Sequence, residues 1–261
     1  MRPVFTRIIF AGLLAFPQLM VSQQVHETTW SDSTLLPLLI INTQGLEIPD
    51  EPRIVAHMGL IHNETGGYNK LTDPYSEYNG QISIELRGES SQYYYAKKSF
   101  SIETQTSNGD NNNVSILGLP EENDFVLNAP YGDKSLMRNV LSYRLFEKFG
   151  HYSPRTRFVE VILNGDFQGL YVLTEKIKRD KNRVDISKIT PKDTTPDDIS
   201  GGYLLRIDKT TDMEPYEYWE SSAIPPFAEK QRVTYQYFDP DYYELTLARS
   251  RICTCLPSVR I

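Results

Sequence analysis

Hydrophobic and polar positions alternate with the period of a β-strand along much of this chain. The clearest case is Arg157–Lys178, where two apolar runs flank Asn164-Gly165. The Asn-Gly pair favours a type I′ turn because both central residues of that turn need a positive φ. The pattern predicts a β-hairpin whose second strand runs on into the charged segment Thr174-Glu175-Lys176.

Shorter runs with the same alternation predict further strands. Ile82, Ile84 and Leu86 fall on one face of a strand, and Phe100 and Ile102 share a face of the next one. The ranges in which we expect strands are Leu38–Asn42, Arg53–Ile61, Gln81–Leu86, Lys98–Glu103, Phe125–Leu127, Gly201–Asp208 and Val233–Phe238. Two stretches that contain Gly or Pro, Glu64–Gly80 and Thr210–Lys230, are expected to be irregular.

One main helix is predicted, from Asp133 to about Phe149. Asp is a favoured N-cap residue, and Gly150 is placed to end the helix at C′. Apolar side chains recur on one face, which predicts that the helix packs on the sheet; they are Leu136, Met137, Val140, Leu141, Leu145 and Phe149. The fold class is therefore α+β, with a mostly antiparallel sheet and one main helix.

Residues 1–24 have the pattern of an export signal. Arg2 and Arg7 form a positive n-region, and the apolar run Ile8–Phe16 is too short to span a bilayer. The segment predicts a secreted or cell-surface protein with no stable membrane span after the signal peptide is cleaved. A retained N-terminal anchor is the alternative.

Composition narrows the classes of partner. The formal net charge is −7, which argues against nucleic acid as the main partner because phosphate contacts need clustered Lys and Arg. The four histidines show no metal-binding spacing, so we predict no metal site from them. The 17 tyrosines suit packing in a sheet, although an exposed carbohydrate- or peptide-binding surface is an alternative.

The end of the chain differs from the rest. Residues 248–261 hold three arginines, no acid and both cysteines, Cys253 and Cys255, and they follow neither a helical nor a strand period. We interpret this segment as an aberrant tail that follows a frameshift or a premature stop near Leu247. A genuine frayed terminus is the alternative.

The segment between the predicted strands at Gln81–Leu86 and Lys98–Glu103 carries residue types that hold phosphate groups. Gly88 lets a ligand approach the backbone closely, and hydroxyl groups and positive charges can bind phosphate oxygens. These candidates are Arg87, Ser90, Ser91, Lys97 and Lys98. The alternative is a polar hairpin loop with solvated lysines.

The sequence leaves two questions about side-chain direction: which of Lys97 and Lys98 faces inward, and whether Arg138 faces the candidate loop. By alternation Lys98 shares the inward face of Phe100 and Ile102, and Lys97 lies on the other face. Arg138 and Asn139 come early in the predicted helix. Arg138 either pairs with a surface acid or points at phosphate from the side of the candidate loop.

Four ordered blocks form a recognisable set. They are R-G-E-S-S-Q…K-K-S-F at 87–100, L-G-L-P…N-D-F-V-L-N-A-P-Y-G-D-K-S-L-M-R-N at 117–139, F-V-E-V-I-L-N-G-D-F-Q-G-L-Y-V-L-T-E-K-I at 158–177 and G-G-Y-L-L-R-I-D at 201–208. The set resembles the CotH family, the spore-coat protein H-type proteins, which are related in fold to atypical secreted protein kinases. The resemblance covers roughly residues 38–247.

The resemblance implies an ATP- and Mg²⁺-dependent kinase that phosphorylates serine or threonine on an exported or surface protein. It assigns Arg87, Ser90, Ser91, Lys97 and Lys98 to the phosphate side, Arg138 and Asn139 to the flanking helix, and Glu175, Lys176 and Ile177 to the hinge where backbone groups meet adenine. It also implies an atypical kinase-like N-terminal lobe over residues 25–190, which faces the nucleotide, and the start of an incomplete second lobe over 191–247.

The chain also departs from this family. It has no match to the family's catalytic-loop aspartate or to its metal-binding W-D-F-D-like segment, so the catalytic residues are unknown and no metal ligands are assigned. It also lacks the G-x-G-x-x-G, V-A-I-K and H-R-D motifs of common protein kinases. Because phosphoryl transfer depends on charge neutralisation, we expect this polypeptide to be inactive alone. A non-catalytic coat or surface scaffold and a secreted carbohydrate-binding module are the alternatives.

Overall fold

The structure is a computed structural model that describes residues 33–190, 192–193, 195, 197–198, 201–211, 213–221 and 232–245. The predicted signal peptide (1–24) and the predicted aberrant tail (248–261) lie outside the described residues. The described part consists mainly of β-strands with one helix of 11 residues, so the α+β class is confirmed with the sheet dominant.

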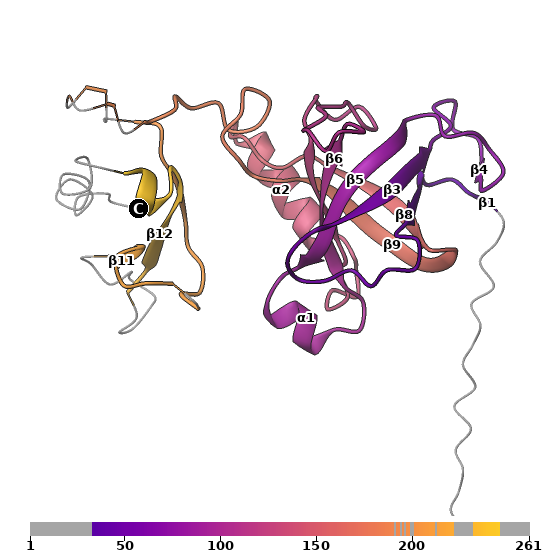
Figure 1. Cartoon of the computed structure of the whole chain (residues 1–261), viewed down its shortest axis with the longest axis horizontal. Helices are drawn as coiled ribbons and strands as arrows, with labels where there is room; N and C mark the ends of the chain where they lie inside the picture. Colours follow the sequence, from indigo (N-terminus) through magenta and orange to yellow (C-terminus); the bar gives the residue numbers. More distant parts are fainter. Residues whose placement is uncertain are drawn as a thin grey trace, which may run out of the picture. The chain divides into compact units, whose positions relative to one another are not determined.

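Seven strands close into a barrel (Figure 1). In order around the barrel they are β2 (Leu38–Asn42), β3 (Ile54–Ile61), β5 (Tyr78–Arg87), β6 (Ser99–Gln105), β7 (Asp124–Asn128), β9 (Asp166–Glu175) and β8 (Thr156–Leu163). Neighbours are antiparallel except β2 and β8, which pair in parallel and close the sheet. Closure leaves this sheet without an unpaired edge. The mostly antiparallel sheet is confirmed, whereas the sequence did not predict its closure.

The inward faces of the strands form one hydrophobic core, as the alternation predicts. Ile82 and Ile84 on β5 are fully buried, and Phe100 and Ile102 on β6 join the same cluster. From the predicted hairpin, Val159, Val161, Tyr171 and Leu173 enter the core.

The predicted hairpin is confirmed. β8 and β9 pair antiparallel around Asn164 (φ 51°) and Gly165 (φ 90°), the two positive φ angles that a type I′ turn needs. Asn164 has a second role, because its Oδ1 accepts a hydrogen bond from Thr43 N at 2.8 Å. The turn is thereby attached to the residue that follows β2.

Two helices flank the strands. α1 (Ser90–Tyr94) is a single short helix within the segment where we expected only a loop. α2 (Arg138–Lys148) begins five residues after the predicted cap, although Asp133 Oδ2 still accepts from Arg138 N at 2.8 Å. Gly150, with φ 84°, follows the end of α2 as predicted.

The expectation that the main helix packs on the sheet is wrong. α2 lies wholly within the described residues, and none of its side chains is buried. Leu141 on its apolar stripe is 57% exposed, and Phe149 just beyond its end is 69% exposed. An apolar stripe on a helix does not show which element will cover it. Here the side chains of the barrel strands fill the barrel core, and no residue of α2 belongs to that core.

Three further strands form a separate sheet in the order β10 (Leu204–Arg206), β12 (Thr234–Asp239), β11 (Tyr218–Glu220). Its small core contains Tyr237 and Leu245, and a short 3₁₀ helix, Tyr242–Glu244, follows it. β11 lies in a stretch predicted to be irregular, and so does β4 (Asn69–Lys70), which pairs with the short strand β1 (Ser33–Thr34). Within the described residues, no helix is long and apolar enough to cross a membrane.

Candidate nucleotide-binding pocket

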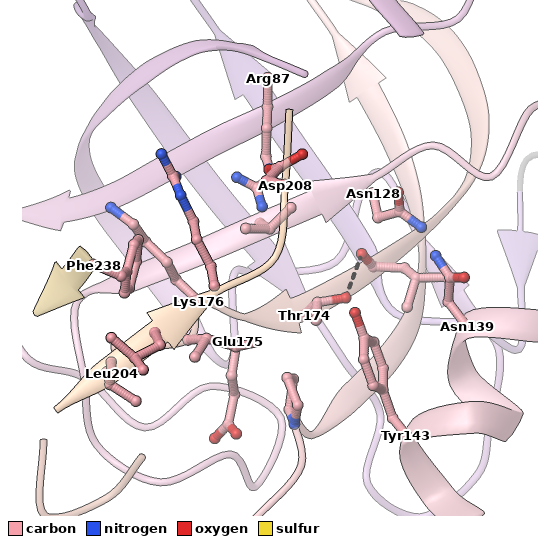
Figure 2. A pocket seen from close by; sticks show the side chains of 16 residues that line it. Arg87, Asn128, Asn139, Tyr143, Thr174, Glu175, Lys176, Leu204, Asp208 and Phe238 are labelled. Atoms are coloured by element: carbon pink, nitrogen blue, oxygen red, sulfur yellow. Dashed lines mark hydrogen bonds between the residues drawn. The ribbon is translucent and has the colours of Figure 1, made fainter. Parts of the chain in front are cut away.

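A pocket of about 470 Å³ lies on the outer face of β7 and β9. Val126 and Asn128 on β7 and Val172 and Thr174 on β9 alternate with core residues of the same strands, which places these four on the outer face of the sheet. The lining residues are Arg87, Val126, Asn128, Asn139, Tyr143, Pro154, Val172, Thr174, Glu175, Lys176, Ile177, Leu204, Leu205, Arg206, Asp208 and Phe238 (Figure 2).

Four of the nine residues predicted from the sequence line this pocket: Arg87, Asn139, Glu175 and Lys176. They come from the end of β5, from α2 and from the exit of β9, so segments far apart in the chain meet at one site. The other five do not line it: Ser90, Ser91, Lys97, Lys98 and Arg138. Whether those five contact a nucleotide stays a prediction.

Ser90, Ser91 and Lys98 belong to the neighbourhood of α1. Lys98 Nζ donates to the backbone oxygen of Tyr95 at 2.8 Å and also to that of Gln92, so its ammonium group stabilises the end of this helix. Ser90 Oγ accepts a hydrogen bond from Lys209, which follows β10. Hydrogen bonds within this segment, together with the one from Lys209, therefore hold it in place.

The expected faces of the two lysines are reversed. Lys97 Nζ lies 4.2 Å from the ring centroid of the core residue Tyr171 and donates to Leu170 O at 2.5 Å. Burial lowers the pKa of Lys97 to about 8. Because β6 begins only at Ser99, both lysines precede the strand and do not follow its alternation.

Arg138 follows the simpler of its two alternatives. Its Nε lies 3.4 Å from Asp133 Oδ1, and its side chain is 78% exposed. A pair of this kind contributes little to stability because water screens it. Asn139, the next residue, lines the pocket instead.

Glu175 lines the pocket, but its carboxylate does not point into it. Figure 2 shows this carboxylate directed away from Arg87 and Asn139. It is fully buried and accepts hydrogen bonds from Arg183 Nη1 at 2.7 Å and from Arg155 Nε at 2.9 Å. The sequence did not single out Arg155 or Arg183, because nothing in the local pattern indicates that they share one carboxylate.

A second ionic cluster lies beside Lys176. Lys178 Nζ is 2.7 Å from both Glu122 Oε1 and Asp124 Oδ2, and Lys176 Nζ is 3.4 Å from Asp124 Oδ1. Burial by itself would raise the pKa of Asp124, but the hydrogen bond from Lys178 and the charges of both lysines outweigh it, and the pKa is lowered. The cluster ties the segment after β9 to the beginning of β7.

We therefore expect Asp124→Asn to destabilise the protein in a pH-dependent way. A lowered pKa means that the charged form of Asp124 stabilises the fold above the unfolded pKa of about 3.9, and that this stability is lost as the pH falls through the folded pKa. The difference in unfolding free energy from wild type should be about 2 kcal/mol at pH 7 and should shrink at pH 3. Urea unfolding at both pH values measures it, and the exposed Asp110→Asn is the control. A difference that stays constant with pH would contradict this role.

The lining of the pocket combines apolar surfaces with cations and amides. Val126, Val172, Leu204 and Phe238 offer apolar surface, and Arg87, Lys176 and Arg206 bring positive charge. Its volume falls within the range of about 300–1,000 Å³ that is usual for small-molecule sites. Such a lining fits a flat base attached to an anionic group.

The lining offers one carboxylate for a Mg²⁺ ion, that of Asp208, because Glu175 Oε1 and Oε2 are engaged by arginines. Mg²⁺ in nucleotide sites is usually bound by one or two carboxylates together with substrate phosphates. No group of three or more His, Cys, Asp or Glu side chains with metal-binding geometry occurs in the described part of the chain.

Comparison with known proteins identifies the family. The sequence model described as "CotH kinase protein" matches residues 84–246, which is more than half of the chain. The Inner spore coat protein H of Bacillus subtilis (strain 168) is 45% identical over 51 residues, which cover 20% of this chain and only 14% of that protein. The matched range contains β6 to β9, α2 and the whole pocket lining. The chain therefore belongs to the CotH family.

Proposed function

We propose that this pocket binds ATP and that the chain is the nucleotide-facing part of a CotH-type protein kinase. The supporting observation is the convergence of Arg87, Asn139 and the segment Glu175–Ile177 on one pocket. The resemblance to the CotH family assigned these residues separately to a phosphate side, a flanking helix and a hinge. In this proposal the barrel acts as the kinase-like N-terminal lobe, and residues 191–247 begin a second lobe.

Each part of the lining has a separate task in the proposal. The apolar side chains of Val126, Val172 and Leu204 cover the faces of the base and exclude water from it. Arg87 is an exposed cation at the end of β5, where it binds phosphate oxygens as a charge-assisted donor. Bound ATP would supply the phosphoryl group that the complete kinase transfers to serine or threonine.

The substrate and the location are proposed at the level of class. The printed name of the relative from Bacillus subtilis concerns the inner spore coat. Together with the export pattern of residues 1–24, this supports an exported or surface protein as the substrate and a coat or cell-surface location for the chain. The acidic composition of the chain argues against nucleic acid as its main partner, since phosphate backbones attract basic surfaces.

We expect Arg87→Ala to weaken ATP binding about tenfold or more, because a hydrogen bond to a charged group contributes about 1.5–3 kcal/mol. Adenosine, which has no phosphate, should bind the variant as tightly as it binds the wild type. Isothermal titration calorimetry with the 261-residue chain measures both affinities.

Arg144→Ala is the matched control, since Arg144 is also an exposed arginine but lies on α2 in a pair with Glu147, does not line the pocket and is not among the candidate site residues. Its ATP affinity should equal that of the wild type. If wild-type chain binds neither ATP nor adenosine, the proposal fails and a non-catalytic coat or surface scaffold becomes the better explanation.

One observation favours a second candidate, a carbohydrate-binding surface. Tyr93 on α1 is 85% exposed and packs edge-to-face against Tyr94, with ring centroids 5.1 Å apart. Flat exposed aromatic rings of this kind can stack on sugars. Binding of a soluble polysaccharide that is abolished by Tyr93→Ala would support this candidate over the kinase.

A further inference from the structure

One buried carboxylate connects four segments around the pocket. Glu175 is the last residue of β9, Arg155 immediately precedes β8, and Arg183 lies in the segment that follows β9. Backbone groups also join Arg155 to Glu175: Arg155 N donates to Glu175 Oε2 at 3.0 Å, and Glu175 N donates to Arg155 O at 3.1 Å. On β7, the ring of Phe125 lies opposite Glu175 and 5.7 Å from the guanidinium carbon of Arg183.

Stability alone is a poor explanation for this cluster. Burying an ion pair costs desolvation energy, and well-packed apolar residues often stabilise a protein equally well or better. Arg183 is also incompletely satisfied, since its Nε and Nη2 have no hydrogen-bond partner among the described residues. What such a cluster does provide is a fixed geometry, because each charged hydrogen bond is directional.

That geometry matters where the strand ends. Lys176 and Ile177 directly follow Glu175, and both line the pocket. Beyond Glu175, where β9 stops, the pairing with β7 continues as one long hydrogen bond, from Lys176 N to Asp124 O at 3.5 Å. The two arginines hold the side chain of this last residue from the side opposite the pocket lining.

We propose that Glu175 is a positioning residue: held by Arg155 and Arg183, it sets the path of Lys176 and Ile177 so that they meet the base of the nucleotide. This inference rests on the proposed function. It adds a role for the Glu175 carboxylate that requires no contact with the ligand. Loss of the carboxylate charge should then weaken binding of the base and leave the phosphate contacts unchanged.

The test compares adenosine with ATP in Glu175→Gln, measured by calorimetry at a temperature at which circular dichroism shows the variant to be folded. We expect adenosine and ATP to lose affinity by the same factor, about tenfold, which corresponds to the loss of one good hydrogen bond. Arg87→Ala should instead weaken ATP alone. Glu147→Gln, which removes an exposed carboxylate 3.3 Å from Arg144, is the control and should change neither affinity.

A second pair of variants keeps the test decisive if Glu175→Gln does not fold. Arg155 is partly exposed, so its replacement is milder than that of a fully buried residue. Arg155→Met should lower the affinity for adenosine, and Arg155→Lys, which retains the charge, should restore part of it.

The possible results separate this inference from the proposed function. Absence of nucleotide binding by the wild type would overturn both. Wild-type binding together with unchanged adenosine affinity in the folded Glu175 or Arg155→Met variants would overturn only the positioning role, even if their melting temperatures fall. A loss confined to ATP would also overturn it, because the cluster would then act on the phosphate side.

Discussion

Replacing Phe125 by alanine is expected to lower the free energy of unfolding by about 3–5 kcal/mol, the usual cost of removing a buried phenylalanine. Phe125 is 1% exposed and belongs to the barrel core. It pairs with Ile102 on β6 and with Glu175 on β9, so its ring lies where two neighbouring strands meet. The cavity left by alanine cannot close easily, because the strands of a closed barrel are hydrogen-bonded on both sides.

Urea unfolding followed by circular dichroism measures this loss, and Phe146→Ala is the matched control. Phe146 is a phenylalanine of α2 that is 51% exposed and contacts the ring of His151. Its removal should change the unfolding free energy by less than about 1 kcal/mol. Equal losses for the two variants would contradict the arrangement in which the barrel interior is the main core and α2 lies outside it.

The strands could be predicted because their evidence is local. Alternation of apolar residues defines β2, β5 and β6 within two or three residues, and Asn164-Gly165 defines the turn between β8 and β9. Barrel closure could not be predicted in the same way. It depends on the parallel pairing of β2 with β8, which lie more than a hundred residues apart and are not consecutive.

The site shows the same division between local and long-range information. Arg87 and Lys176 were identified from their residue type and motif, and they do line the pocket. The face of Lys98 was predicted wrongly because the strand begins one residue later than its period suggested. Glu175 was identified as a site residue, but its partners Arg155 and Arg183 could be found only once β8, β9 and the following segment had been brought together.

The second large effect is expected at Arg183. Its side chain is fully buried and its Nη1 lies 2.7 Å from the fully buried carboxylate of Glu175. Removal of one partner of a buried ion pair leaves a charge without full compensation, which typically costs about 3–5 kcal/mol. For Arg183→Met we expect about 3 kcal/mol, the lower end of that range, because Arg155 still pairs with Glu175.

A double-variant cycle shows whether this cost comes from the pair itself. When Glu175→Gln is added to Arg183→Met, the carboxylate that has lost its partner is neutralised, so the double variant should lose less stability than the sum of the two single variants. Arg144→Met, which breaks the exposed pair with Glu147, should cost less than about 1 kcal/mol. Strict additivity of the two buried substitutions would mean that Arg183 stabilises the fold through packing on Phe125 alone. A less-than-additive result would establish the ion pair as the interaction that fixes the end of β9.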